Sequence, residues 1–289
     1  MSIAQAMLQL AIGVSFGLLL FLLASGFTLT FGLGRFVNLT HGAVFMVSAY
    51  VATSFAGRGS FLVAVVAAGV VGVVLSLVVY GVTLLRWSTL ANNELSQVLL
   101  TFGLVLVFAE VARVLWDGLP RALPAPGFAS GSWDLAGVSF PAYRVLMGAV
   151  ALGLAALLWF VQERTRFGAM VRAGVDDREM LEATGVGAVP LFGAVFALSG
   201  LLAGIAGGIG APVLGASIGQ EFGVLVLAFV IVVLGGAGSL KGAFAASLAV
   251  GVADAFGKAL LPVFAEFTMM ALVVVVLAWR PEGIFGGAR

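Results

Sequence analysis

The stretch MLQLAIGVSFGLLLFLLASGFTLTFGL, residues 7–33, contains no Asp, Glu, Lys or Arg. A helix needs about 20 predominantly apolar residues to cross the hydrocarbon core of a bilayer, and this stretch supplies them. The apolar segment of a cleavable signal peptide is shorter, about 7–15 residues, and follows a positively charged start. Here the first basic residue is Arg35, which comes after the apolar stretch. Residues 7–33 therefore predict a membrane-spanning helix rather than a targeting segment.

Similar apolar stretches recur along the whole chain. Of its 289 residues, 62% are hydrophobic and only 9% are charged, whereas a soluble domain has roughly 25% charged residues. The predicted spans are residues 7–33, 36–56, 61–85, 95–116, 143–161, 190–212, 222–239, 243–261 and 263–279. Some of these segments contain polar or Gly-rich interruptions and are expected to be broken or re-entrant, so we expect eight to ten helices. The predicted fold class is an all-α, polytopic membrane bundle that forms one domain over residues 1–289.

The composition excludes several classes of function. The net charge of +1 gives no basic field for nucleic acid. With no Cys and a single His, the chain can scarcely form a metal cluster or a nucleophile–base pair. Lys241 lies in a Gly-rich turn but is followed by Gly242, whereas a phosphate-binding loop requires Gly-Lys-Ser/Thr. We therefore expect a protein in contact with lipid that is not an enzyme and has no catalytic residue, cofactor or metal.

The distribution of basic residues predicts the orientation in the membrane. Nine spans with the N-terminus outside and the C-terminus in the cytoplasm put nine of the 14 Lys and Arg residues on the cytoplasmic side, as the positive-inside rule favours. The largest inner loop, residues 162–190, carries four of these Arg residues. The longest outer loop, residues 117–142, is rich in Pro and Gly, and we expect it to be ordered but irregular. Trp133 and its acidic neighbours in that loop fit either a docking rim for a soluble partner or an ordered plug.

The inner loop contains a predicted amphipathic helix. From Ala169 to Thr184, Met170, Ala173, Asp177, Met180, Leu181 and Thr184 recur at helical spacing, and Gly185 is a plausible C-cap. The charged residues of this segment are Arg172, Asp176, Asp177, Arg178, Glu179 and Glu182. A helix with a mixed-charge face suits docking on a protein partner, and a connector lying along the lipid headgroups is the alternative.

Two interruptions of the apolar pattern are candidates for a transport pathway. The first comprises Asn38, Thr40, His41 and Gly42, and the second comprises Gly235, Gly236 and Ser239. Polar groups inside a span are costly and often functional, and interrupted segments in two halves of a chain point to a transport site. The structural alternative is that Asn38 and His41 satisfy backbone groups freed at a helix break, which is the commoner role for a single buried His.

Other polar and small residues inside the spans are interpreted as structural. Glu110 and Arg113 are three residues apart, and Asp254 and Lys258 are four apart, so each pair is predicted to form an intrahelical ion pair. A proton relay is the alternative. Gly204, Gly207, Gly208 and Gly210 predict a close-packing helix face. An ion-coupled carrier would need a buried unpaired carboxylate, whereas Glu110 and Asp254 within the predicted spans each have a basic neighbour.

Four sequence blocks resemble the branched-chain amino-acid ABC transporter permeases of the LivH/LivM type. They are NLTHG at residues 38–42, TRFGAMVRA at 165–173 followed by DDRE at 176–179, VLGGAGS at 233–239, and RPEGIFG at 280–286. The blocks occur in order and bracket most of the chain. The resemblance implies an importer permease that moves branched-chain amino acids or a related small polar or organic substrate, with urea, short amides and aromatic acids as the alternatives.

The resemblance also implies partners and roles. It implies a second permease subunit, identical or similar, two cytoplasmic ATPase subunits and an extracytoplasmic substrate-binding protein, in a bacterial-type inner (plasma) membrane. The helix of the inner loop would then be the coupling helix that contacts the ATPase, and the substrate would pass near the midplane beside the two interruptions.

Overall fold

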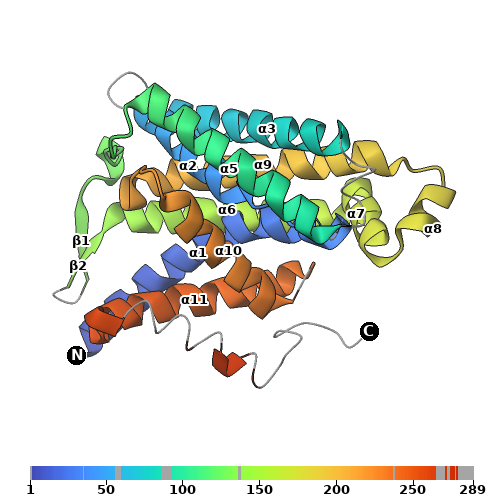
Figure 1. Ribbon diagram of the computed structural model, residues 1–289. Helices are drawn as coiled ribbons and strands as arrows, with labels where there is room; N and C mark the ends of the chain where they lie inside the picture. Colours follow the sequence, from blue (N-terminus) through green and yellow to red (C-terminus); the bar gives the residue numbers. More distant parts are fainter. Residues whose placement is uncertain are drawn as a thin grey trace.

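The computed structural model describes residues 2–34, 36–55, 60–85, 93–135, 138–236 and 238–264, and residues 271, 274–276 and 278. The chain is a bundle of long helices with a small hairpin at one end and two short helices at the other (Figure 1). Its elements are α1 (Ile3–Gly34), α2 (Thr40–Ser54), α3 (Phe61–Leu85), α5 (Glu94–Trp116), η1 (Gly127–Ala129), β1 (Ser132–Leu135), β2 (Val138–Pro141), α6 (Ala142–Arg164), α7 (Arg166–Asp176), α8 (Arg178–Ala183), α9 (Ala188–Leu214), α10 (Gln220–Gly235), α11 (Leu240–Leu260) and η2 (Pro262–Phe264).

Within the described residues, six helices are long and apolar enough to cross a membrane, namely α1, α3, α5, α6, α9 and α11. The other two apolar helices, α2 with 15 residues and α10 with 16, are shorter. At about 1.5 Å per residue, each is about 22–24 Å long and falls short of the hydrocarbon thickness of about 30 Å. The all-α polytopic bundle is confirmed, and eight of the nine predicted spans coincide with helices. The ninth, 263–279, lies almost entirely outside the described residues.

Six of the described helices form two similar units of opposite direction. Each unit is a long, a short and a long helix: α1–α2–α3 and α9–α10–α11. In Figure 1, α1 runs from the hairpin end to the α7–α8 end, and α9 runs back. The two most extensive helix pairings are α3 with α9 and α1 with α11. If each helix is replaced by its counterpart in the other unit, one of these pairings becomes the other. Such inverted repeats are common in transporters and place the ligand site at the interface between the repeats.

Glycines allow the repeats to approach closely. A Cβ on Gly200 of α9 would overlap the backbone carbonyl of Gly72 in α3, and a Cβ on Gly72 would overlap the carbonyl of Gly200. The predicted close-packing face of α9 is confirmed, because Gly204 and Gly208 lie against α3 and Gly207 lies against α2. Lipid provides no hydrophobic driving force between helices, so such backbone contact and its dispersion energy hold the bundle together.

Both long loops contain secondary structure that differs from the expectation. The outer loop is predicted to be irregular, but it forms an antiparallel hairpin in which Trp133 pairs with Phe140. Backbone hydrogen bonds of 2.8 Å in both directions between Arg121 and Ala216 fasten this loop to the α9–α10 connection. The single inner-loop helix predicted from Ala169 to Thr184 is wrong. The chain is extended at Asp177, whose side chain accepts a hydrogen bond from the Met180 N–H, so α7 ends and α8 begins there.

The contact between α3 and α9 leads to a stability prediction. The Gly200→Ala variant should be destabilised by about 1–3 kcal/mol, because no side-chain rearrangement can make room for a methyl group against a backbone carbonyl. Gly103→Ala on α5 is the matched control, since nothing lies within 4 Å of the position that its new methyl group would take. Thermal unfolding in detergent, followed by size-exclusion chromatography, measures both. Equal melting temperatures for the two variants would contradict the close approach of α3 and α9.

Candidate functional site

The first interruption of the apolar pattern brings the chain back into the bundle after α1 ends. His41, at the start of α2, lies at the level of Leu23, 11 residues before the end of α1. Its ring is 1% exposed. Nε2 donates to the carbonyl oxygen of Leu23 at 2.7 Å, and Nδ1 lies 3.3 Å from the hydroxyl of Ser199 on α9. A carbonyl oxygen only accepts, so the ring carries its proton on Nε2 and accepts from Ser199 at Nδ1.

Both nitrogens of His41 are therefore used in joining α2 to α1 and α9. The ring is also close to Phe27, with centroids 5.9 Å apart. This geometry fits the structural alternative, in which the imidazole satisfies polar groups at a helix break. We call His41, Leu23 and Ser199 the histidine clamp.

Asn38 and Thr40 form a second buried group of hydrogen bonds at the same break. The Oδ1 atom of Asn38 accepts from the backbone N–H of Thr40 at 3.1 Å and from its hydroxyl at 2.5 Å. The side chains are 2% and 0% exposed. Asn38 therefore satisfies an amide at the start of α2 that has no partner within the helix.

Gly42 marks the contact between the two short helices. A Cβ at this position would overlap the carbonyl of Glu221, and it would lie 3.0 Å from the Cβ of Leu225, both in the first turns of α10. The N-terminal turns of α2 and α10 thus meet inside the bundle, and the two helices run from there toward opposite ends. This is the arrangement expected of paired half-helices in inverted repeats.

Glu221 is a buried carboxylate that lies outside every predicted span and is not among the predicted site residues. It is 3% exposed, and its Oε2 atom accepts from the backbone N–H of Gly219 at 2.7 Å. Its negative charge lies at the N-terminus of α10, where the helix dipole favours it. Because Glu221 immediately precedes the predicted span 222–239, the hydropathy pattern places it in a loop. Its only signal in the sequence is a lone carboxylate between two apolar segments.

The second interruption lies at the α7–α8 end of the bundle, away from the first. Ser239 accepts from the N–H of Gly242 at 3.0 Å and caps α11. Gly236 and Gly238 have φ values of 91° and 80°, and Gly238 packs against Gly32 near the end of α1. The structure does not bring this turn to Asn38–Gly42, because Gly32 follows Leu23 by nine residues, about 14 Å along the helix axis.

The inner-loop helices rest on this turn. The side chain of Val175 in α7 lies so close to Gly32 and Gly238 that it would contact a Cβ placed on either glycine. Val171, Gly174 and Leu181 are buried against the bundle. Of the predicted coupling residues, Arg172, Asp176, Asp177, Glu179, Glu182 and Gly185 are exposed, and the Arg178 side chain lies outside the described structure.

The predicted coupling residues divide into two groups by their contacts. Asp177 caps the start of α8, and Gly185, with φ of 85°, is the left-handed residue that follows the C-cap Thr184. These two shape the loop, while Arg172, Asp176, Glu179 and Glu182 present charge on its surface. Met180 is predicted on the apolar face of one continuous helix, but the break at Asp177 leaves it 64% exposed.

Both predicted ion pairs within spans are present. The Nε atom of Arg113 lies 3.1 Å from a carboxylate oxygen of Glu110, and the Lys258 ammonium lies 2.7 Å from Asp254. Both side chains of the Glu110–Arg113 pair are exposed, whereas the Asp254 side chain is only 14% exposed.

Known proteins resemble the chain over nearly its whole length. The permease protein BraD of the high-affinity branched-chain amino acid transport system of Pseudomonas aeruginosa is 27% identical, over 96% of this chain and 95% of the relative. The permease protein LivH of the corresponding Escherichia coli system is 28% identical, over 96% and 94%. The probable branched-chain amino acid transport permease LivH of Methanocaldococcus jannaschii is 24% identical, over 93% and 89%. No solved structure shows significant similarity to the chain.

The family model described as branched-chain amino acid transport system / permease component matches residues 9–279. This range includes both short helices, the histidine clamp and the inner-loop helices. The chain is thus a multi-pass membrane transport protein and belongs to the branched-chain amino acid transport permease family.

Proposed function

We propose that this chain is the permease subunit of an ATP-driven importer that moves branched-chain amino acids into the cell. The observation that carries the proposal is the family match over residues 9–279, combined with a helix pair that exposes a charged surface at one end of the bundle. In this proposal ATP is hydrolysed by two cytoplasmic partner subunits, a second permease completes the pathway, and a soluble protein delivers the substrate. Urea, short amides and aromatic acids are the alternative substrates.

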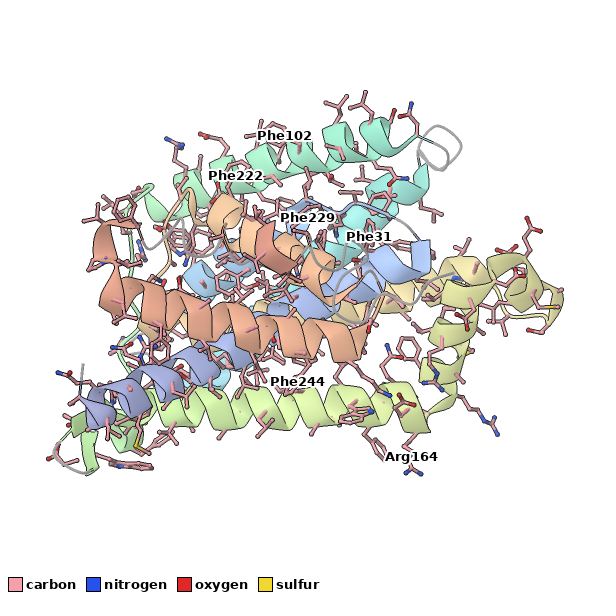
Figure 2. The ribbon with its side chains drawn as sticks, turned by 90° about the horizontal axis from the view of Figure 1, so that it is seen from below. Phe31, Phe102, Arg164, Phe222, Phe229 and Phe244 are labelled. Atoms are coloured by element: carbon pink, nitrogen blue, oxygen red, sulfur yellow. The ribbon has the colours of Figure 1, made fainter. Side chains whose placement is uncertain are left out.

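The proposed orientation places the α7–α8 end in the cytoplasm of a bacterial-type plasma membrane. Four Arg residues lie at or beside this end: Arg164, Arg166, Arg172 and Arg178. Figure 2 shows Arg164 at the end of α6 where α7 begins. Basic residues in short loops are retained on the cytoplasmic side. The N-terminus, which lies at the hairpin end in Figure 1, is then outside.

The α7–α8 pair is proposed as the coupling element. Its charged surface, with Met180 projecting from it, fits a complementary groove on an ATPase subunit. Its inner face touches the end of α1 and the α10–α11 turn through Val175. A displacement of α7 is therefore transmitted by direct packing to α10.

The hairpin end is proposed as the docking surface for the substrate-binding protein. Trp133 is 56% exposed and Phe128 is 79% exposed. Exposed aromatic side chains are enriched in interfaces. The backbone bonds between Arg121 and Ala216 connect this surface to the start of α10.

The pathway is proposed to pass between the repeats. Asn38, Thr40, His41 and Gly42 position the start of α2 at its middle, and Gly235, Gly236 and Ser239 shape the turn at its cytoplasmic end. Because their hydrogen bonds are used within the protein, these residues position helices beside the pathway. We assign them no direct hydrogen bond to the substrate.

The second candidate function is an ion-coupled carrier. Such a carrier requires a buried carboxylate without a basic partner, and among the described residues Glu221 fits this requirement. Its backbone hydrogen bond and its place at a helix N-terminus account for its charge without ion transport. Reconstitution in vesicles separates the two functions.

With the partner subunits and ATP present, leucine uptake should proceed without an ion gradient and should stop when ATP is replaced by a non-hydrolysable analogue. The readout is accumulation of labelled leucine in sealed vesicles. Uptake by this chain alone, driven by a proton or sodium gradient, would overturn the importer assignment.

Reversing the exposed charges of the coupling element should uncouple the transporter. Arg172→Glu with Asp176→Lys and Glu179→Lys should lower co-purification of the ATPase and reduce uptake by at least about tenfold, because complementary charges become repulsive. Asp134→Lys, which alters an exposed acid at the opposite end, should leave ATPase binding unchanged. Normal ATPase binding and uptake by the triple variant would contradict the coupling role.

Loss of the histidine clamp should destabilise the fold without changing substrate affinity. In His41→Phe the Leu23 carbonyl and the Ser199 hydroxyl lose this hydrogen-bond partner, at a cost of about 1–3 kcal/mol. We expect a lower melting temperature and an unchanged KM for leucine in the folded fraction. A large rise in KM with unchanged stability would show instead that His41 contacts the substrate.

A further inference from the structure

A cavity of about 610 Å³ lies between α1, α10 and α11. Its size is within the range of about 300–1,000 Å³ that is typical of small-molecule sites. The wall is apolar over most of its area and includes Phe16, Leu20, Leu23, Phe45, Phe222 and Val226. The described polar residues of the wall are Gln220, Asp254 and Lys258.

The cavity exists because the two inverted repeats differ. In the first repeat, α2 is fixed to α1 and α9 by the histidine clamp and by the contact of Gly207 with the Phe45 backbone. In the second repeat, α10 touches α11 closely at Gly235 and Gly242. From this turn the two helices separate toward the hairpin end (Figure 1), where the first turns of α10 and the last turns of α11 line the cavity.

The ion pair of α11 supplies opposite charges at the hairpin end of this apolar space. The Lys258 ammonium is 2.7 Å from Asp254 and 5.7 Å from the centre of the Phe16 ring. The Lys258 side chain is 64% exposed, whereas that of Asp254 is only 14% exposed. Arg144 of α6 also interacts electrostatically with Asp254, which adds a second positive charge near this carboxylate.

The other intrahelical pair provides a comparison within the same chain. Glu110 and Arg113 on α5 are 64% and 59% exposed and are not in the wall of this cavity. An ion pair whose only role is to lower the free-energy cost of placing charges on a membrane span does not require a cavity beside it. The pair on α11, in contrast, presents a cation and an anion together at the end of a hydrophobic space.

We propose that this cavity binds a free zwitterionic α-amino acid with an apolar side chain. Lys258 binds the carboxylate, Asp254 binds the ammonium group, and the aliphatic side chain enters the space between Leu20, Phe222 and Val226. The charges of the amino acid insert between those of the ion pair, so both substrate charges remain paired in a site of low polarity. The inference rests on the proposed function and deepens it by naming the site and the recognised groups.

Binding of labelled leucine to the full chain in nanodiscs tests the site, with two competitors that each lack one charge. These are 4-methylpentanoate, which has only the carboxylate, and 3-methylbutylamine, which has only the ammonium group. Lys258→Met should weaken leucine binding by at least about tenfold while retaining competition by the amine. Asp254→Asn should weaken it similarly while retaining competition by the carboxylate. Glu110→Gln and Arg113→Met are the matched controls and should bind leucine as wild type does.

A steric variant tests the cavity without altering any charge. Gly223 lines the cavity, and nothing lies within 4 Å of the position that a Cβ on this residue would take. Gly223→Phe should therefore fold, with a melting temperature close to that of wild type, and should lose leucine binding. Wild-type leucine affinity in Gly223→Phe, or in both charge variants, would overturn the proposed site. Equal loss of both competitors in each charge variant would also overturn the assignment of the two charges.

Uptake by the assembled transporter distinguishes failure of the site from failure of the proposed function. If the wild-type transporter accumulates no branched-chain amino acid, the proposed substrate is wrong. If it accumulates leucine and the Lys258, Asp254 and Gly223 variants do so with unchanged KM, the transport function stands and the site is refuted. A rise in KM of at least about tenfold in these variants, with ATPase binding retained, supports both.

Discussion

The structure depends on one constraint, which is that a backbone amide or carbonyl cannot be left unpaired inside a bilayer. Two short helices begin partway along the bundle, and their first amides have no partner within their own helix. At α2 the Asn38 side chain pairs one of these amides, and at α10 the Glu221 carboxylate pairs the amide of Gly219. Of the buried side-chain oxygens and nitrogens in the described residues, only Ser48 Oγ and Gln162 Oε1 lack a partner. The interruptions persist because protein, rather than lipid, surrounds them.

The same constraint explains the use of glycine between the repeats. Helices that begin or end inside the bundle must be covered closely, and close covering requires small residues at the crossing points. Gly72 and Gly200 bring the α3 and α9 backbones together, and Gly42 brings the starts of α2 and α10 together. Phe27 on α1 and Phe229 on α10, with ring centroids 6.4 Å apart, fill space further along, and Phe229 is labelled on α10 in Figure 2. Backbone proximity and aromatic packing thus replace the hydrophobic driving force that lipid does not provide.

Hydropathy predicts the positions of the described long helices well, because it directly reflects the environment of each segment. It could not predict that α2 and α10 are short, because apolar connecting residues such as Phe36 extend the hydrophobic pattern beyond the helix. Glu221 was missed for a related reason: a single carboxylate beside an apolar segment has the same pattern whether it lies in water or inside a bundle. The break at Asp177 depends on a side-chain cap that competes with helix continuation, and periodicity alone does not resolve that competition.

The repeats also differ in how their short helices are held, and this difference connects the two ends of the molecule. The start of α2 is held by side-chain hydrogen bonds to two neighbouring helices. α10 is instead bounded by glycines with positive φ, Gly219 at its start and Gly236 at its end. Glycine adopts such backbone conformations without steric cost, so the chain can change direction at either end of α10 while the helix itself stays intact. One end of α10 adjoins the turn that α7 contacts, and the other lines the cavity beside Asp254 and Lys258. A rigid helix of about 24 Å therefore joins the charged inner-loop surface to the apolar cavity, and no chain of side-chain rearrangements is needed between them.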